Sequence, residues 1–294
     1  MPVLTARPTI ALRNMIVATD FSFASDLALT YANAIARYYG AKLQLVHALE
    51  AGHGTAPHTT TFWGRETEGD AREKLLREAR KCGDLHSSYR VLKGTPQQVV
   101  EDMLSLEDLD LVVIGIHPAR GLRKAAVGYA AEYFFRHSNC PVLAVGPWAR
   151  RCAPGWGPKR VLLATDLQSD ESRAAQAAVF VAREHGARLA LLHVAPPAPP
   201  PYPDDQQAIT RPYFQSRLQE LLSYKASLDY PAEFWVEFGE DAVAEIVRLT
   251  RQRAIDLLVL SVHRQEPWGF HFVHEAYRIV AEAPCPVLVT RRKY

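Results

Sequence analysis

Ala18-Thr19-Asp20, which closes the apolar run Met15–Thr19, recurs 146 residues later as Ala164-Thr165-Asp166. The same offset relates four further pairs: Gly40-Ala41 with Gly186-Ala187, His47 with His193, Asp110 with Asp256, and His117 with His263. Near the end of each copy, Cys140-Pro-Val-Leu143 recurs as Cys285-Pro-Val-Leu288 at an offset of 145. A register held to within one residue over roughly a hundred positions indicates two copies of one domain.

The length of the chain agrees with this repeat. A chain of 294 residues is too long for one ordinary compact domain and sufficient for two. The stretch Ala149–Pro158 carries the glycines and prolines that are typical of a linker. We therefore expect a first domain at residues 1–148, a linker at 149–158 and a second domain at 159–294.

Short apolar runs alternate with helical patterns in each copy. Met15–Thr19 is typical of a strand buried on both faces. Ser25–Tyr39 has apolar residues at helical spacing, and Gly40 follows where a glycine commonly ends a helix. The other predicted strands are 42–48, 89–93, 111–116, 141–145, 160–165, 188–194, 232–238, 257–262 and 286–290, and the other predicted helices are 71–82, 96–106, 125–137, 171–184, 212–226, 242–251 and 271–281. This alternation predicts an α/β fold of two tandem, doubly wound, Rossmann-like parallel sheets with about five strands each.

The composition argues against several classes of protein. Lys and Arg total 34 and Asp and Glu total 32, which gives a formal net charge of +2. This small charge argues against a protein that binds nucleic acid through a broad basic face. The longest apolar runs, such as Leu257–Val262, are far shorter than the roughly 20 residues that cross a bilayer. Met1–Asn14 lacks the sustained apolar segment of a signal peptide. We expect a cytoplasmic protein that binds neither nucleic acid nor a membrane.

Polar residues and glycines gather at one edge of each predicted sheet. Doubly wound sheets bind ligands beyond the carboxyl ends of their strands. The residues at these ends are Asp20 and Asp166 after the first strand, His47 and His193 at the second, and His117 and His263 after the fourth. Gly115, Gly121 and Gly128 surround the turn from the fourth strand into the last helix, where backbone N–H groups can hold phosphates.

At these residues the sequence resembles the universal stress protein family, in two tandem copies that span nearly the whole chain. The matching pieces in the first copy are Ile16–Ser22, Leu45–Ala48, Val113–His117 and Asn139–Val145. Each piece is short, but their order and spacing recur in the second copy. The resemblance implies Rossmann-like domains of the adenine nucleotide alpha hydrolase-like kind.

The resemblance also implies a nucleotide site in the first copy. Nucleotide-binding members of the family carry G-x2-G-x9-G-[S/T] after the fourth strand. Its glycines cradle ribose and phosphates, and the first-strand Asp and the end of the second strand meet ribose and adenine. In this chain the implied nucleotide-binding residues are Asp20, Ala48, Gly115, His117, Gly128 and Tyr129, and the implied ligand is ATP with Mg²⁺.

Both copies depart from that motif. In the first copy Pro118 replaces the second glycine and removes an N–H donor, and Tyr129 replaces the Ser or Thr. A shifted loop that uses Gly121 is an open alternative. In the second copy the four motif positions read Ser261, Arg264, His274 and Glu275. Glu275 would place a carboxylate where a phosphate should lie, so we expect no ATP binding there in the family manner.

Other readings of the same residues compete with these roles. Asp20 also suits a helix N-cap, and His47 and His193 suit structural hydrogen bonds to neighbouring strand ends. Four histidines of the second copy, together with Asp166, have the side chains of a set of zinc ligands. They lack the closely paired spacing of known metal-binding motifs, so we expect no metal. These histidines are His193, His263, His271 and His274. No catalytic residue can be assigned, because no triad order, P-loop or kinase motif is present.

The resemblance implies an accessory or regulatory protein of the cytoplasmic stress response. We expect the two domains to pair within the chain as a pseudo-dimer, through the apolar last strands 141–145 and 286–290. We also expect a homodimer and protein partners of unknown identity. Two mechanisms remain open: action through protein contacts alone, or a nucleotide-dependent switch in the first domain. A slow ATP hydrolase ranks last, because only Asp20 or His117 could serve as general base.

Overall fold

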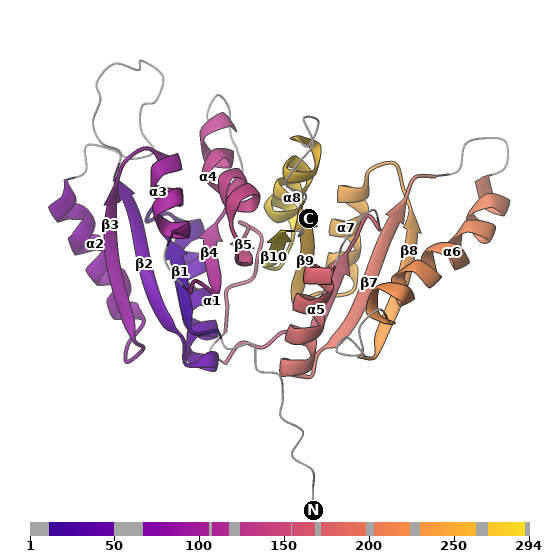
Figure 1. Cartoon of the computed structure of the whole chain (residues 1–294), viewed down its shortest axis with the longest axis horizontal. Coiled ribbons are helices and arrows are strands. Elements are labelled where there is room, and N and C mark those ends of the chain that lie inside the picture. Colours follow the sequence, from indigo (N-terminus) through magenta and orange to yellow (C-terminus); the bar gives the residue numbers. More distant parts are fainter. Residues whose placement is uncertain are drawn as a thin grey trace, which may run out of the picture.

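A single ten-stranded sheet runs through the computed structural model (Figure 1). The structure describes residues 12–49, 67–105, 108–117, 124–153, 155–167, 172–197, 203–223, 230–262 and 270–291. The strand order is β3-β2-β1-β4-β5-β10-β9-β6-β7-β8, so each half of the chain contributes five neighbouring strands. The two halves meet in the middle of the sheet, at β5 and β10.

Each half is a parallel α/β sheet with the strand order 3-2-1-4-5. The first half contains β1 (Asn14–Ala18), α1 (Phe23–Tyr39), β2 (Lys42–Leu49), α2 (Glu68–Lys81), β3 (Ser87–Lys93), α3 (Pro96–Leu104), β4 (Leu111–Gly115), α4 (Lys124–His137) and β5 (Val142–Val145). The second half contains β6 (Arg160–Ala164), α5 (Ser172–His185), β7 (Arg188–Ala195), α6 (Pro203–Ser223), β8 (Ala232–Phe238), α7 (Ala242–Gln252), β9 (Leu257–Val262), α8 (Phe270–Glu282) and β10 (Val287–Arg291). The predicted fold class is confirmed.

Helix α6 corrects the sequence prediction. The prediction started this helix at Pro212, but α6 spans Pro203–Ser223 and holds Pro212 in its interior. Pro203 suits the first helical position equally well, and Asp204 and Asp205 follow it in the acidic first turn that favours a helix start. Packing of α6 on β7 and β8 offsets the hydrogen bond that an interior proline removes.

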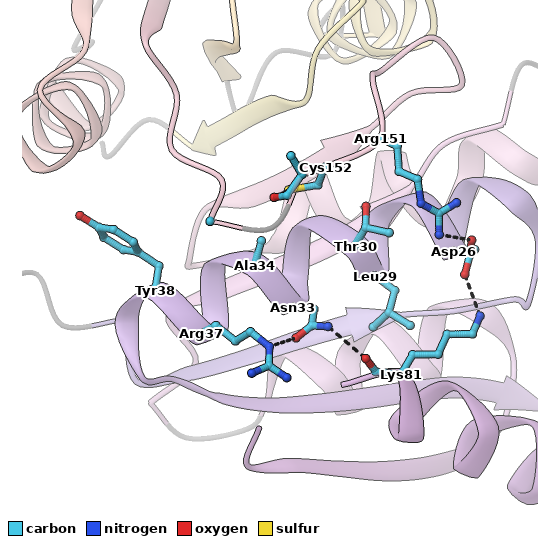
Figure 2. A pocket seen from close by; sticks show the side chains of 12 residues that line it. Asp26, Leu29, Thr30, Asn33, Ala34, Arg37, Tyr38, Lys81, Arg151 and Cys152 are labelled. Carbon is cyan, nitrogen blue, oxygen red and sulfur yellow. Dashed lines mark hydrogen bonds and ion pairs between the residues drawn. The ribbon is translucent and has the colours of Figure 1, made fainter. Parts of the chain in front are cut away.

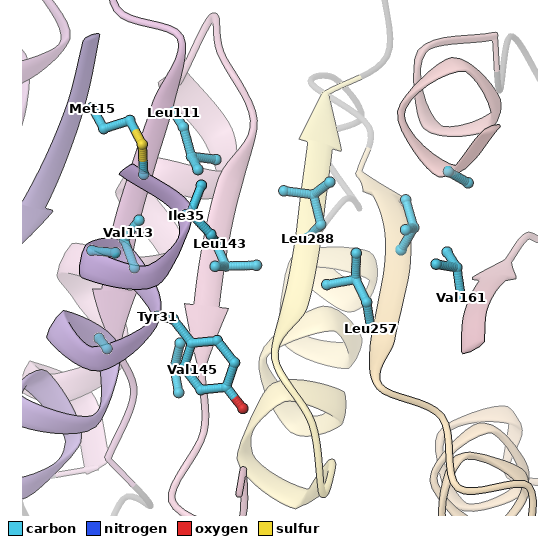
Figure 3. Close-up of a cluster of buried hydrophobic side chains, with 14 of the residues drawn as sticks. Met15, Tyr31, Ile35, Leu111, Val113, Leu143, Val145, Val161, Leu257 and Leu288 are labelled. Carbon is cyan, nitrogen blue, oxygen red and sulfur yellow. The ribbon is translucent and has the colours of Figure 1, made fainter. Parts of the chain in front are cut away.

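Two apolar cores lie on opposite faces of the sheet, and each runs through both halves. The core on one face is formed with α1, α2, α5 and α6, and the core on the other face with α3, α4, α7 and α8. Figure 3 shows part of the first core, where Leu143 on β5 faces Leu288 on β10. Both leucines are buried. Because neither core stops at the middle of the sheet, the two halves bury apolar surface against each other.

The last strands of the two halves pair with each other. β5 and β10 are antiparallel, with Val142 opposite Val289, Leu143 opposite Leu288, and Ala144 opposite Val287. Leu143 and Leu288 are equivalent residues of the repeat, so this pair lies at the centre of a two-fold arrangement. The expected pseudo-dimer through the last strands is therefore present within the chain.

Aromatic residues at the end of α1 extend this contact to α5. The Tyr38 hydroxyl donates to the Glu184 carbonyl oxygen at 3.3 Å, and the Tyr39 hydroxyl lies 3.4 Å from His185 Nε2. Each contact joins residues 146 positions apart, which is the offset of the repeat. The two helices therefore meet through equivalent residues, as the two-fold arrangement requires.

Among the helices in the described ranges, none is long and apolar enough to cross a membrane.

Candidate functional site

The candidate site of the first half lies where β1 and β4 end side by side. These strands are parallel neighbours in the sheet, and the strand order reverses between them. This is the position at which open α/β sheets bind ligands. Asp20 follows β1 and His117 follows β4, so the topology brings together two residues that lie far apart in the sequence.

The Asp20 carboxylate is engaged by residues of its own chain. Asp20 Oδ1 accepts a hydrogen bond from the Ser22 backbone N–H at 3.0 Å, and Asp20 Oδ2 lies 3.4 Å from His117 Nε2. His117 Nε2 also lies 2.5 Å from Ser22 Oγ. The three side chains thus form a closed cluster. Only 15% of the Asp20 side chain is exposed, so a ligand would have to open this cluster to reach the carboxylate.

The ionised form of Asp20 is stabilised by these neighbours. Burial by itself raises the pKa of Asp20, but hydrogen bonds from His117 and Ser22 outweigh burial and lower the pKa from 3.8 to about 2. The carboxylate is therefore charged at neutral pH and already paired.

Ser22, and not Asp20, is the N-cap of α1. Ser22 has extended backbone angles, and its Oγ accepts from the Ser25 backbone N–H at 3.2 Å. The alternative reading of Asp20 as the cap is wrong, because Asp20 instead accepts from Ser22. Ser22 is also a member of the cluster that the sequence reasoning missed. Its signal was available, since serine directly before an apolar helical pattern is a typical cap.

The turn that follows the first strand begins in the same form in both halves. Phe21 has a φ of 59°, and its N–H donates to Thr19 Oγ1 at 3.0 Å. Leu167 has a φ of 58°, and its N–H donates to Thr165 Oγ1 at 3.0 Å. Because non-glycine residues rarely adopt positive φ, this shared strain belongs to the domain fold and not to a ligand of one half.

Gly115 is required by close packing between β4 and α1. A Cβ at Gly115 would lie 2.4 Å from the carbonyl carbon and oxygen of Ala24 and 2.5 Å from the Ser25 nitrogen. These atoms belong to the first turn of α1. The glycine therefore lets the start of α1 lie directly on the end of β4, beside Asp20. Packing explains this residue whether or not a nucleotide binds.

His47 and His193 make the structural hydrogen bonds to neighbouring strand ends that the sequence predicts. His47 Nδ1 lies 2.7 Å from the Thr19 carbonyl oxygen, and His193 Nδ1 lies 3.0 Å from the equivalent carbonyl oxygen of Thr165. Both histidines are buried. Each ring therefore ties the end of the second strand of its half to the end of the first strand.

The other predicted site residues are only partly placed. Ala48 lies in β2, next to His47. Gly128 and Tyr129 lie in α4, and His271 and His274 lie in α8, but the described part of the chain does not include their side chains. Pro118, Gly121, His263 and Arg264 lie outside the described residues. Asp20, Gly115 and His117 are thus the predicted nucleotide-site residues that the structure brings together. Within the described ranges, no group of three or more metal-ligating side chains was found.

A recess lined by none of these cluster residues lies along α1 (Figure 2). It has a volume of about 640 Å³ and is lined by α1, the end of α2 and the segment around Arg151 and Cys152. Asp26 lies between Lys81 Nζ at 2.8 Å and Arg151 at 3.4 Å, and Arg37 pairs with Asp84 at 2.7 Å. These three cations of the recess are already paired with acidic residues, so the recess is a weak candidate for an anion site.

Asp20→Asn is expected to lower the free energy of unfolding by about 2 kcal/mol at pH 7, as the pKa change from 3.8 to about 2 implies. Because the folded-state pKa is depressed, this stabilisation is present above pH 4 and is lost as the pH falls toward 2. Urea unfolding of both proteins between pH 7 and pH 2 measures the difference. Asp84→Asn, at an exposed ion pair, is the control and should change little. A difference that persists unchanged at pH 2 would contradict this account.

Comparison with known proteins agrees with this architecture. The model of the universal stress protein family matches residues 11–146 and 157–291. A universal stress protein of Thermus aquaticus, from the 3' region of a QAH/OAS sulfhydrylase, is 32% identical over 144 residues, which are 45% of this chain and 98% of that protein.

A solved structure that spans nearly the whole chain shows the same fold. A universal stress protein from Archaeoglobus fulgidus DSM 4304 covers 95% of this chain and 98% of its own, with a TM-score of 0.67 at 16% identity. Another from Archaeoglobus fulgidus, solved in complex with dAMP, covers 46% of this chain and 97% of its own, with a TM-score of 0.35 at 19% identity. Since the family model matches nearly the whole chain in two consecutive segments, this protein belongs to the universal stress protein family as a tandem member.

Proposed function

We propose that this protein is an accessory or regulatory protein of the cytoplasmic stress response that acts mainly through contacts with other proteins. In this proposal the first half holds at most a degenerate nucleotide site, and the second half holds none. The observation that carries the proposal is the closed cluster of Asp20, Ser22 and His117, in which both carboxylate oxygens already have partners.

Two further features of the first half support this proposal. Pro118 offers no backbone N–H where the family motif has its second glycine. Gly115 is explained by the close approach of α1, so its presence is not by itself evidence for a phosphate cradle. A buried polar group that is already satisfied gains little from a ligand that must first displace its partner.

The second half supports the same conclusion from charge. Glu275 lies half-buried in α8, at a position where the family motif calls for a residue that caps phosphates. A carboxylate there repels a phosphate group, and the repulsion grows as water is excluded. Ser261, at the end of β9, replaces the first glycine of the motif.

The alternative is an adenine-nucleotide switch in the first half, with ATP and Mg²⁺ as ligand. The position of Asp20 and His117 at the strand-order reversal favours it, because this is where sheets of this class bind nucleotides. The ionised Asp20 would accept hydrogen bonds from ribose hydroxyls if His117 moved away. Slow ATP hydrolysis is a poorer reading, because a carboxylate with a pKa of about 2 is a weak general base at neutral pH.

Calorimetric titration with Mg-ATP separates the two readings. The proposal expects no binding with a Kd tighter than the millimolar range. Micromolar binding that Asp20→Ala abolishes would establish the nucleotide switch and overturn action through protein contacts alone. Asp166→Ala is the matched control, since Asp166 has the same place in the second half. It should leave any binding in the first half unchanged.

A further inference from the structure

The second half of the chain reaches the candidate site of the first half through one tyrosine. Tyr277 lies on α8, and its hydroxyl donates to the backbone carbonyl oxygen of His117 at 2.7 Å. The two residues are 160 positions apart. His117 is the second residue after β4. The hydrogen bond from Tyr277 therefore fixes the beginning of the segment that follows this strand.

The same residue, His117, carries the ring that closes the site. Its Nε2 lies 2.5 Å from Ser22 Oγ and 3.4 Å from Asp20 Oδ2. Its backbone is held by the second half, while its side chain lies against the carboxylate of the first half. Displacing the ring from Asp20 by more than a rotamer change therefore requires that the hydrogen bond from Tyr277 be stretched or broken.

Tyr277 is itself held firmly in place. Its half-buried ring packs against the apolar core that α4 and α8 share, and α4 and α8 are in direct contact. Burial raises the pKa of Tyr277 above its ordinary value. The hydroxyl therefore remains protonated, and able to donate a hydrogen bond, throughout the physiological pH range. Both ends of the hydrogen bond are thus fixed by the pairing of the two halves.

We propose that Tyr277 is a positioning residue that holds His117 against Asp20, so that the second half keeps the nucleotide site of the first half closed. The inference deepens the proposed function, because it gives a physical reason why this site is degenerate. It also predicts that the site opens when the contact between α8 and the end of β4 loosens. A hydrogen bond of this kind is worth roughly a fivefold change in an equilibrium that breaks it.

Tyr277→Phe tests the proposal because it removes the hydroxyl and keeps the ring. The first readout is the NMR signal of the His117 ring in the full-length protein, assigned with His117→Gln. Tyr277→Phe should move this signal in the direction in which Asp20→Asn moves it, because both changes weaken the contact between ring and carboxylate. Tyr133→Phe is the control, since the Tyr133 hydroxyl on α4 contacts Glu101 and Gln97. A His117 signal that stays at its wild-type position in Tyr277→Phe would overturn the proposal.

The second readout is the affinity for Mg-ATP, followed by NMR so that millimolar binding is measured. Tyr277→Phe should lower the Kd roughly fivefold relative to the wild type, and Tyr133→Phe should not. Equal Kd values, or no Mg-ATP-dependent signal in either protein, would overturn the regulatory role. A different result would overturn the proposed function of action through protein contacts. That result is micromolar binding of Mg-ATP by the wild type that Asp20→Ala abolishes. The two failures are therefore distinguishable.

Discussion

Gly146→Ala is expected to lower the free energy of unfolding by more than about 3 kcal/mol and to weaken the pairing of the two halves. Gly146 directly follows β5, and a Cβ at this position would lie 1.9 Å from the Val280 carbonyl oxygen on α8. Because this oxygen belongs to the helix backbone, no side-chain rotation can relieve the clash. The helix would have to move away from β5, and the apolar core shared by the two halves would open.

Urea unfolding measures this prediction, with one probe in each half. The wild type should unfold in one transition, and Gly146→Ala should show a lower midpoint or two separate transitions. Gly155→Ala is the control in the same connecting region. Gly155 has open space around its Cβ position but a φ of +72°, so alanine there should cost only about 1 kcal/mol of strain. Equal effects of the two substitutions would show that the contact with Val280 does not limit the interface.

The repeated residues were informative because most of them perform the same structural task twice. Asp110 Oδ2 accepts from the backbone N–H groups of Arg13 and Asn14 at 2.7 and 2.9 Å. Asp256 Oδ2 does the same for Lys159 and Arg160 at 2.9 and 3.0 Å. Gly40 and Gly186 both have positive φ just after a helix. Because each task recurs at the same offset, it leaves a pattern in the sequence, and the fold class and the strand boundaries could be predicted from it.

The candidate site could be predicted only in part, because its closure depends on contacts between distant residues. The sequence placed Asp20, Gly115 and His117 at one edge of the sheet. It gave no sign that His117 would lie against Asp20, or that Tyr277 would reach His117 from the other half. Periodicity reports which face of an element is buried, but it does not report which side chain meets which across the sheet.

The two copies differ in the region that carries function in this fold class. Asp20 and Asp166 keep the same place after the first strand, and the next residues, Phe21 and Leu167, share the same strained backbone. The end of the fourth strand differs, with Gly115 in the first half and Ser261 in the second. The framework is thus shared, while the segment that would hold a ligand has diverged.

Gly115→Ala is the second substitution with a large expected effect, and it separates two reasons for a glycine at this position. If Gly115 served only a phosphate group, alanine would leave the nucleotide-free protein as stable as before. The Cβ of alanine would instead lie 2.4 Å from the Ala24 backbone, which requires α1 to move off β4. We therefore expect a loss of more than about 3 kcal/mol without any nucleotide, measured by urea unfolding.

Gly40→Ala is the matched control, because Gly40 lies at the other end of α1. It has a φ of +67° and nothing within 4 Å of its Cβ position, so the expected loss is only about 1 kcal/mol of backbone strain. The start of α1 carries Ser22, and Ser22 in turn bonds Asp20 and His117. A shift of α1 in Gly115→Ala would therefore open the Asp20 cluster as well, and the His117 ring signal would move together with the loss of stability. A Gly115→Ala protein as stable as the wild type would contradict the packing role. Ligand binding would then be the better explanation for a glycine at this position.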